Sequence, residues 1–211
     1  MPGARSNRVL VILKAMRRKK KLLKKLPETV AKFVETVKKP FKLFFQDEAR
    51  FGRISQAIAC WAPIGIRPLM PRQIIREYTY AYTAACPKSG ETVSLILPYM
   101  TTDCMNIFLQ ELGHRYENDQ IGLVIDGASS HDAKDLKVPD NITLIPLPPY
   151  SPELNPVENF WKEFRQEGFY NRVFQSLKEV EDLLEEKLKY FMDNPQLVQS
   201  IVGYHWILSA L

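Results

Sequence analysis

Cysteine is scarce in this 211-residue chain, and long apolar runs are missing from it. Its three cysteines, at positions 60, 86 and 104, show no CxxC spacing, which argues against both a disulfide framework and a zinc site. No apolar run approaches the roughly 20 residues that a membrane-spanning helix needs. The apolar stretch near the N-terminus is followed by lysines rather than by a small-residue cleavage site, so it does not predict a signal peptide. We therefore expect a protein of the reducing cytoplasm with no membrane partner.

Charge is distributed unevenly along the chain. The formal net charge is +5, but residues 1–42 carry 14 lysines and arginines against two glutamates, a local charge of +12, whereas residues 43–211 carry −7. A basic arm on an acidic body indicates a polyanionic partner for the arm; a solvated tail is the plain alternative. We expect residues 1–40 to form this arm, helical or partly disordered, and residues 41–211 to form one globular domain.

Two apolar segments of the body each end in an aspartate. Residues 42–48 predict a buried strand that stops at Asp47 and its neighbouring glutamate, with Gly52 as a turn signal further on. Residues 121–126 are a continuous apolar run, typical of a strand buried on both faces, and they stop at Asp126. In folds with parallel strands, chemistry gathers at the carboxyl ends of those strands. Both aspartates are therefore candidate functional residues.

The rest of the body alternates between strand and helix patterns. Residues 77–86 and 91–100 predict a β-hairpin with a four-residue loop, and residues 141–147 predict another strand. A helical pattern follows the hairpin, and a long one returns near the C-terminus over residues 176–194. Hairpin strands followed by alternating strands and helices predict an α/β fold, in which helices cover a mixed sheet.

A proline-rich connection, LPPYSPELNPVENFW over residues 147–161, joins the last predicted strand to a helix. Its four prolines, at positions 148, 149, 152 and 156, fix the backbone and remove donors, which predicts a stiff, extended elbow. Asn155 can cap the helix, Pro156 suits its first position and Glu158 falls at its third. The first turn of the helix thus holds a carboxylate. On the residues alone, a capping-box partner is the competing interpretation of Glu158.

The positions of these carboxylates, more than their number, indicate a metal site. Neighbouring strands lie about 4.8 Å apart, so Asp47 and Asp126 could grip one metal ion if their strands are adjacent. Carboxylates buried together are costly without a cation, and hard oxygen ligands favour Mg²⁺ or Mn²⁺ over zinc. A third carboxylate, Glu158, could complete a two-metal site for in-line phosphoryl displacement.

Four segments together resemble the DDE transposases of the IS630/Tc1/mariner superfamily, and in particular their bacterial IS630 branch. They are QDEARFG (46–52), CWAPIGIRP (60–68), DGASSHDAK (126–134) and the elbow with its helix start (147–161). The resemblance covers about residues 43–170. It implies an RNase H-like fold, a five-stranded mixed sheet flanked by helices, and a catalytic triad of Asp47, Asp126 and Glu158.

The resemblance also implies a reaction and its partners. The triad would hold two Mg²⁺ or Mn²⁺ ions, with Asp47 bridging both, for hydrolysis at a transposon end and attack of the exposed 3′-OH on target DNA. A homodimer is implied, because two transposon ends must be brought together. Relatives carry paired N-terminal helix-turn-helix domains, so we expect a separate or missing DNA-binding region here, and a nucleoid-associated bacterial enzyme. A nuclease without strand transfer and a degenerate remnant that only binds DNA are the alternatives.

Further residues near these motifs are candidate DNA contacts. The resemblance places His131 near the scissile phosphate, with a loop-anchoring role as the alternative. Arg50 and Arg53 are expected to contact phosphates, the alternative being an exposed face that they merely decorate. Trp61 could stack on a base, although a half-buried position in a loop is the favoured interpretation. Glu48 points to the opposite side of its strand, which favours a supporting role over direct metal ligation.

Overall fold

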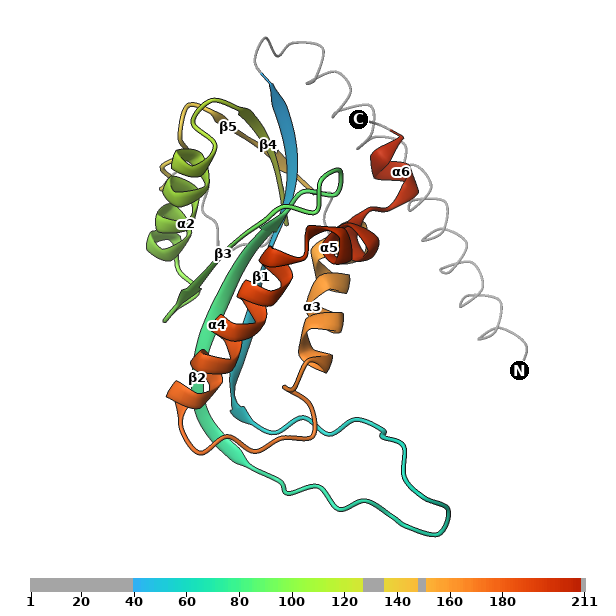
Figure 1. The fold of residues 1–211 in the computed structure, drawn as a ribbon. Coiled ribbons are helices and arrows are strands. Elements are labelled where there is room, and N and C mark those ends of the chain that lie inside the picture. Colours follow the sequence, from blue (N-terminus) through green and yellow to red (C-terminus); the bar gives the residue numbers. More distant parts are fainter. Residues whose placement is uncertain (1–39, 127–134, 148–150, 210–211) are drawn as a thin grey trace, which may run out of the picture.

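A computed structural model describes residues 40–126, 135–147 and 151–209 of this protein (Figure 1). The elements, in chain order, are β1 (Phe41–Ile54), β2 (Ile74–Ala85), β3 (Thr92–Leu97), α2 (Thr102–Arg115), β4 (Gln120–Ile125), β5 (Ile142–Pro146), the 3₁₀ turn η1 (Pro152–Leu154), α3 (Pro156–Gln166), α4 (Leu177–Asp193), α5 (Pro195–Val202) and α6 (His205–Leu208). The predicted basic arm, apart from Pro40, lies outside the described residues.

The five strands form one mixed sheet in the order β3-β2-β1-β4-β5. The longest strand, β1, lies at its centre, antiparallel to β2 and parallel to β4. β3 pairs antiparallel with β2, and β5 pairs parallel with β4. The predicted five-stranded mixed sheet flanked by helices is therefore confirmed. The two strands that lead to the predicted aspartates are neighbours in it.

Helices cover both faces of the sheet, and the alternation of side chains along β1 assigns one hydrophobic core to each face (Figure 1). Phe45 packs with residues of α3, α4 and α5, whereas Phe44 packs with residues of α2. Val124 and Leu123 of β4 divide between the α3 and α2 faces in the same way. Because successive residues of a strand point to opposite faces, odd-numbered residues of β1 face α3 and even-numbered ones face α2.

Strand β1 does not stop at Asp47, as predicted, but continues to Ile54. That prediction was wrong because β2 pairs with β1 from Phe45 onward, so backbone hydrogen bonds support the more polar second half of the strand. Gly52, predicted to mark a turn, lies inside β1 at a shift in the register. A Cβ there would lie 2.3 Å from the carbonyl oxygen of Glu77, so the close approach of β2 requires glycine.

The C-terminal part of the chain completes the core on the α3 face. The long predicted helix is confirmed as α4, with Ser176 as its capping residue. Two short helices that the sequence pattern did not indicate, α5 and α6, follow it, and Val198 and Val202 of α5 are buried in the same core. No helix in the described ranges is long and apolar enough to cross a membrane.

The connection between β1 and β2, residues 55–73, extends away from the sheet (Figure 1). Its base is held to the chain after α3: the side chain of Asn171 accepts a hydrogen bond from the backbone N–H of Ile58 at 2.9 Å. Further out, Trp61 is fully exposed, as is Ile64. The favoured half-buried position for Trp61 was therefore wrong, because this connection leaves the body of the protein before the tryptophan is reached.

Candidate active site

The parallel pairing of β1 and β4 brings Asp47 and Asp126 together. The last register pair of these strands joins Phe45 to Val124, and each aspartate follows its member of that pair by two residues. Two residues along a strand return a side chain to the same face, and both members of the pair face α3. Asp47 therefore points to the α3 face, and Asp126, the residue directly after β4, lies at the same end of the paired strands, near enough for its charge to act on Asp47.

A single asparagine fixes the start of α3 against β1. Asn155 caps the helix, its side-chain oxygen accepting a hydrogen bond from the backbone N–H of Val157 at 3.1 Å. Its side-chain Nδ2 donates to the backbone carbonyl of Gln46 at 2.9 Å, and the residue is buried. Glu158 is the third residue of the helix, as predicted. Asn155 thus ties the turn that carries Glu158 to the strand position next to Asp47.

Aromatic packing holds the remainder of α3 against the same strand. Phe51 of β1 meets Trp161 and Phe164 of α3 edge to face, with ring centroids 5.8 and 5.6 Å apart. Phe169, just after the helix, lies 4.8 Å from Phe51, and all four rings are buried. Such pairs contribute about 0.5–1.5 kcal/mol each beyond the burial of their area. The apolar face of α3 therefore sets its direction and leaves Glu158 exposed at its beginning.

The surroundings of Asp47 oppose its ionisation. Burial raises its pKa most, and the carboxylates of Glu158, Glu48 and Asp126 raise it further. A hydrogen bond with the backbone of Glu48 acts in the opposite direction, and the result is a pKa of about 8. Without a cation, Asp47 is therefore largely protonated at neutral pH. The repulsion from Glu158 and Asp126 also means that the structure brings the three predicted triad residues into one neighbourhood.

The donors in this neighbourhood suit a hard divalent cation. They are carboxylate oxygens whose mutual repulsion a cation would relieve, and oxygen ligands are those that Mg²⁺ and Mn²⁺ prefer. Within residues 40–126, 135–147 and 151–209, no three acidic, histidine or cysteine side chains lie close enough to hold one ion together.

Arg53 is engaged by the protein itself. Its guanidinium forms an ion pair with Glu77 at 2.8 Å and donates to the backbone carbonyl of Phe174 at 3.1 Å. The side chain is largely buried by these partners, so it braces the end of β1 against the segment that follows α3. A contact between Arg53 and DNA stays a prediction. On binding DNA, Arg53 would either keep Glu77 and Phe174 as partners or exchange them for the phosphate.

The other predicted contacts are distributed over the surface. Arg50 is exposed, and its guanidinium lies 4.6 Å from the centroid of the Tyr78 ring. Trp61 lies in the exposed connection between β1 and β2. Glu48 faces α2, as predicted from the alternation along β1. His131 lies outside the described residues, and DNA contacts by Arg50, Trp61 and His131 stay predictions.

Two features of the site were missed at the level of the sequence. Arg165 lies seven residues after Glu158, about two helical turns further along the same side of α3, and stands 5.0 Å above the Phe51 ring. Counting turns from Glu158 could have identified it. The bond from Asn155 to Gln46 had no signal in the sequence, because it exists only when α3 packs on β1.

Comparisons with known proteins agree with this geometry. Residues 42–181 match the family described as DDE superfamily endonuclease. The uncharacterized protein y4pE/y4sA of Sinorhizobium fredii (strain NBRC 101917 / NGR234) is 38% identical over 130 residues, which cover 61% of this chain and 96% of that protein. The matched range spans the positions of all three predicted triad residues, whose catalytic role stays a prediction.

Solved structures with a similar fold come from the Mos1 transposase. The Mos1 mariner paired-end complex with Mn has a TM-score of 0.59 and 15% identity, over 93% of this chain and 62% of the Mos1 chain. The catalytic domain of Mos1 mariner transposase has a TM-score of 0.53 and 13% identity, over 92% of this chain and 93% of that domain. At such identities the likeness concerns the fold, which agrees with the expected RNase H-like arrangement. This chain spans about 62% of the length of the Mos1 chain in the complex.

Proposed function

Because this chain belongs to the DDE superfamily endonucleases, we propose that it is the catalytic part of a DNA transposase, which cleaves DNA at a transposon end and joins the freed 3′-OH to target DNA. The resemblance inferred from the sequence motifs is confirmed at the level of the family. The proposal is carried by one observation: the β1–β4 register and the bond from Asn155 to Gln46 gather Asp47, Asp126 and Glu158 on one face of the sheet.

We assign distinct roles to the three carboxylates. Asp47 would be shared by two Mg²⁺ or Mn²⁺ ions, with Asp126 as the second ligand of one and Glu158 as the second ligand of the other. Such ions, when bound, supply a nucleophile at neutral pH and stabilise charge on the leaving oxygen. The protein's own contribution is placement: the strand register fixes the aspartates, and Asn155 fixes the helix turn that carries Glu158. A bound cation would favour the ionised form of Asp47, which burial and the neighbouring carboxylates disfavour.

We infer that DNA is the partner. Mos1 transposase forms a paired-end complex with the left transposon end, and its paired-end complexes contain Mn or Mg. In this chain, the basic stretch of residues 1–40 would add electrostatic affinity for DNA. We further propose that the chain divides at residue 40 into this arm and the catalytic domain, and that a helix-turn-helix region is supplied separately. The protein would then act at the bacterial nucleoid, in the cytoplasm.

We propose that the chain acts as a homodimer. The connection over residues 55–73 supports this, because it carries large apolar side chains in the open: Trp61, Ile64 and Leu69 are almost or fully exposed. Exposed apolar side chains that gather in one place commonly mark a surface that binds another protein. Mass measurement in solution, with and without DNA, tests this part of the proposal. A chain that stays monomeric on DNA while joining ends would contradict it.

The experiment uses the full chain with duplex DNA that carries the terminal sequences of its own element. We expect strand cleavage and joined products in the presence of Mg²⁺ or Mn²⁺ and neither in the presence of EDTA. Asp126→Asn should abolish both without changing the thermal unfolding transition by more than a few degrees. Cleavage retained by Asp126→Asn would remove the triad assignment.

The products distinguish the alternative functions. Nicked DNA without joined DNA would indicate a nuclease rather than a transposase. Binding without any metal-dependent cleavage by the wild-type chain would indicate a remnant that only binds DNA.

A further inference from the structure

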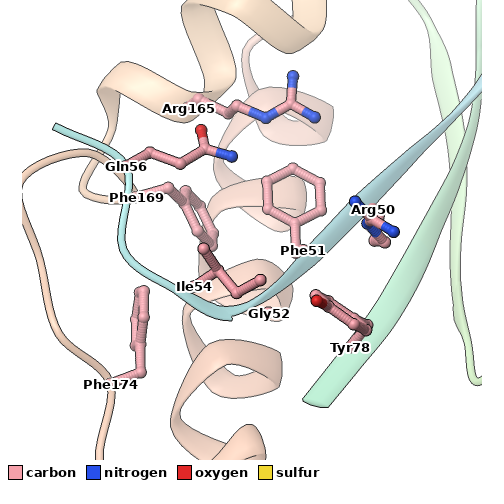
Figure 2. Close-up of a pocket in the computed structure, with 9 residues that line it drawn as sticks. All are labelled: Arg50, Phe51, Gly52, Ile54, Gln56, Tyr78, Arg165, Phe169 and Phe174. Carbon is pink, nitrogen blue, oxygen red and sulfur yellow. The ribbon is translucent and has the colours of Figure 1, made fainter. Parts of the chain in front are cut away.

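A hollow opens beside β1, four residues along the strand from Asp47 and next to the end of α3 (Figure 2). Its volume is about 100 Å³, room for a group of the size of a phosphate. Arg50 and Arg165 line it with guanidinium groups and Gln56 with an amide, and none of its lining residues is acidic. The hollow is thus a site of positive charge next to the acidic centre.

Both guanidinium groups are held by aromatic rings. Arg165 lies over Phe51 from α3, 5.0 Å from the ring centroid, and Arg50 lies over Tyr78 from β1, 4.6 Å from the ring centroid (Figure 2). Among the described residues, neither guanidinium forms an ion pair or a hydrogen bond. A stacked guanidinium keeps its N–H donors available at its edge. Side chains held in advance also lose less entropy when they bind.

The contrast with Arg53 on the same strand separates two kinds of arginine. Arg53 is paired with Glu77 and bonded to the carbonyl of Phe174, so its charge is compensated inside the protein. Arg50 and Arg165 carry charges that the described part of the protein does not compensate. An anion with several acceptor oxygens would satisfy both of them, and guanidinium groups match phosphate oxygens in geometry.

We propose that this hollow binds a backbone phosphate of the DNA strand, about two to four nucleotides from the phosphate held at the carboxylates; this inference rests on the proposed function. Four residues of a strand span on the order of 13 Å. Successive phosphates of one DNA strand advance about 3.4 Å along the axis and lie roughly twice that far apart in space, because the backbone winds around the axis. Arg165 reaches this phosphate from the α3 face of β1, and Arg50, an even-numbered residue of the strand, reaches it from the other face. The contact fixes the register of DNA on the protein and reads no base.

The first test compares variants of the full chain for DNA binding as a function of salt. Arg50→Gln and Arg165→Gln each remove one guanidinium, and Arg115→Gln, on α2 at the opposite face of the sheet, is the matched control for loss of one charge. We expect each hollow variant to lower affinity about tenfold at low salt and to reduce the slope of log affinity against log salt by about one. In the control variant, both the affinity and the slope should change much less.

The second test alters the DNA and leaves the protein intact, so it stands even if a variant folds poorly. Duplexes carrying one uncharged methylphosphonate linkage, moved along the strand, are bound by the wild-type chain in EDTA. We expect a loss of affinity when the neutral linkage lies about two to four nucleotides from the cleavage position. The affinity of Arg165→Gln should not change with the neutral linkage at that position, because this variant has already lost the contact.

The outcomes separate this inference from the function on which it rests. If the wild-type chain cleaves DNA but Arg50→Gln and Arg165→Gln bind like Arg115→Gln, and no single neutral linkage near that position matters, the phosphate site is wrong and the function stands. If the wild-type chain never cleaves DNA yet shows the expected losses, the site stands as a DNA-binding site and the proposed catalysis is wrong.

Discussion

The two faces of the sheet differ most at the level of Asp47. On the α3 face, Asp47 and Asp126 are only partly buried and meet the exposed first turn of a helix. On the α2 face, one residue before and after Asp47 along the strand, Gln46 is buried and Glu48 partly buried. There the strand is covered by the apolar side of α2, whose Phe108 is buried 5.9 Å from the Tyr82 ring. A step of one residue along β1 thus separates a carboxylate centre from a packed core.

The two covering helices begin in different ways. Thr101 caps α2 from its own loop, accepting a hydrogen bond from the backbone N–H of Cys104 at 3.3 Å. Asn155 caps α3 and at the same time donates to the sheet. The start of α2 is therefore stabilised locally, whereas the start of α3 is positioned relative to β1. This difference suits a helix that must deliver a carboxylate to a fixed place.

The largest expected effect tests whether the faces differ in function. Asp47→Asn should reduce metal-dependent cleavage to background, because it removes the carboxylate common to both proposed ions. Glu48→Gln, one residue along the strand and facing α2, should leave measurable cleavage, lowered by no more than about 10–100-fold, the typical effect of an outer-shell residue. Gel assays of nicked and joined DNA measure both. Equal losses in the two variants would erase the distinction between the faces.

The next effect separates capping from positioning at Asn155. Asn155→Ala removes the cap and the bond to Gln46, and we expect it to lower the free energy of unfolding by about 2–4 kcal/mol. Asn155→Ser keeps a capping oxygen but is too short to reach Gln46. It should recover about 1 kcal/mol of stability while cleavage stays impaired. Full recovery of cleavage by serine would show that the bond to the strand does not position Glu158.

The pH dependence of stability tests the charge arrangement on the α3 face. The pKa of Asp47 is raised from 3.8 to about 8 in the folded protein, so the native state binds the proton more tightly than the unfolded state. This contribution to stability is fully present below about pH 4 and is lost as the pH rises to about 8. Without metal, the melting temperature of the wild-type chain should fall over this range more steeply than that of Asp47→Asn. Parallel curves would contradict the raised pKa.

The raised pKa of Asp47 also predicts that the affinity for metal depends on pH. Because Asp47 must lose its proton before it ligates a cation, Mn²⁺ affinity should rise about tenfold per pH unit up to about pH 8. Calorimetric titration at several pH values, in buffers of different ionisation enthalpy, measures both the affinity and the proton released. Binding that does not vary with pH would place the ion elsewhere.

The smallest expected effect concerns the packed α2 face. The side-chain amide nitrogen of Gln46, Nε2, is buried and has no hydrogen-bond partner among the described residues. Gln46→Met keeps the volume and removes this donor, so we expect stability to be unchanged or to rise by up to about 1 kcal/mol. Denaturant unfolding measures the change. A loss of several kcal/mol would reveal a polar role for this face.

Much of this architecture could be predicted because the relevant signals are local. The apolar run that ends at Asp126, the proline elbow and the cap at Asn155 each depend on a few adjacent residues, and the structure has β4 and α3 where these patterns place them. The adjacency of the two aspartate strands was a condition of the metal hypothesis, and it is met. The family resemblance supplied the link between these distant segments.

The features that could not be predicted depend on packing between distant segments. The extension of β1 past Asp47 is supported by β2, and the need for Gly52 arises from the approach of Glu77. The sequence grouped Arg50 with Arg53, but only the folded chain pairs Arg53 with Glu77 and sets Arg165 across the hollow from Arg50. Local patterns therefore locate the carboxylates, whereas their surroundings require the tertiary structure.

Crystals of the full chain soaked in Mn²⁺ provide the most direct test of the central claim, because the anomalous signal locates the ions. The account predicts manganese between Asp47 and Asp126 and between Asp47 and Glu158, with the occupancy lost in Asp47→Asn. Manganese absent from these carboxylates at saturating concentration, or bound only elsewhere on the protein, would contradict it.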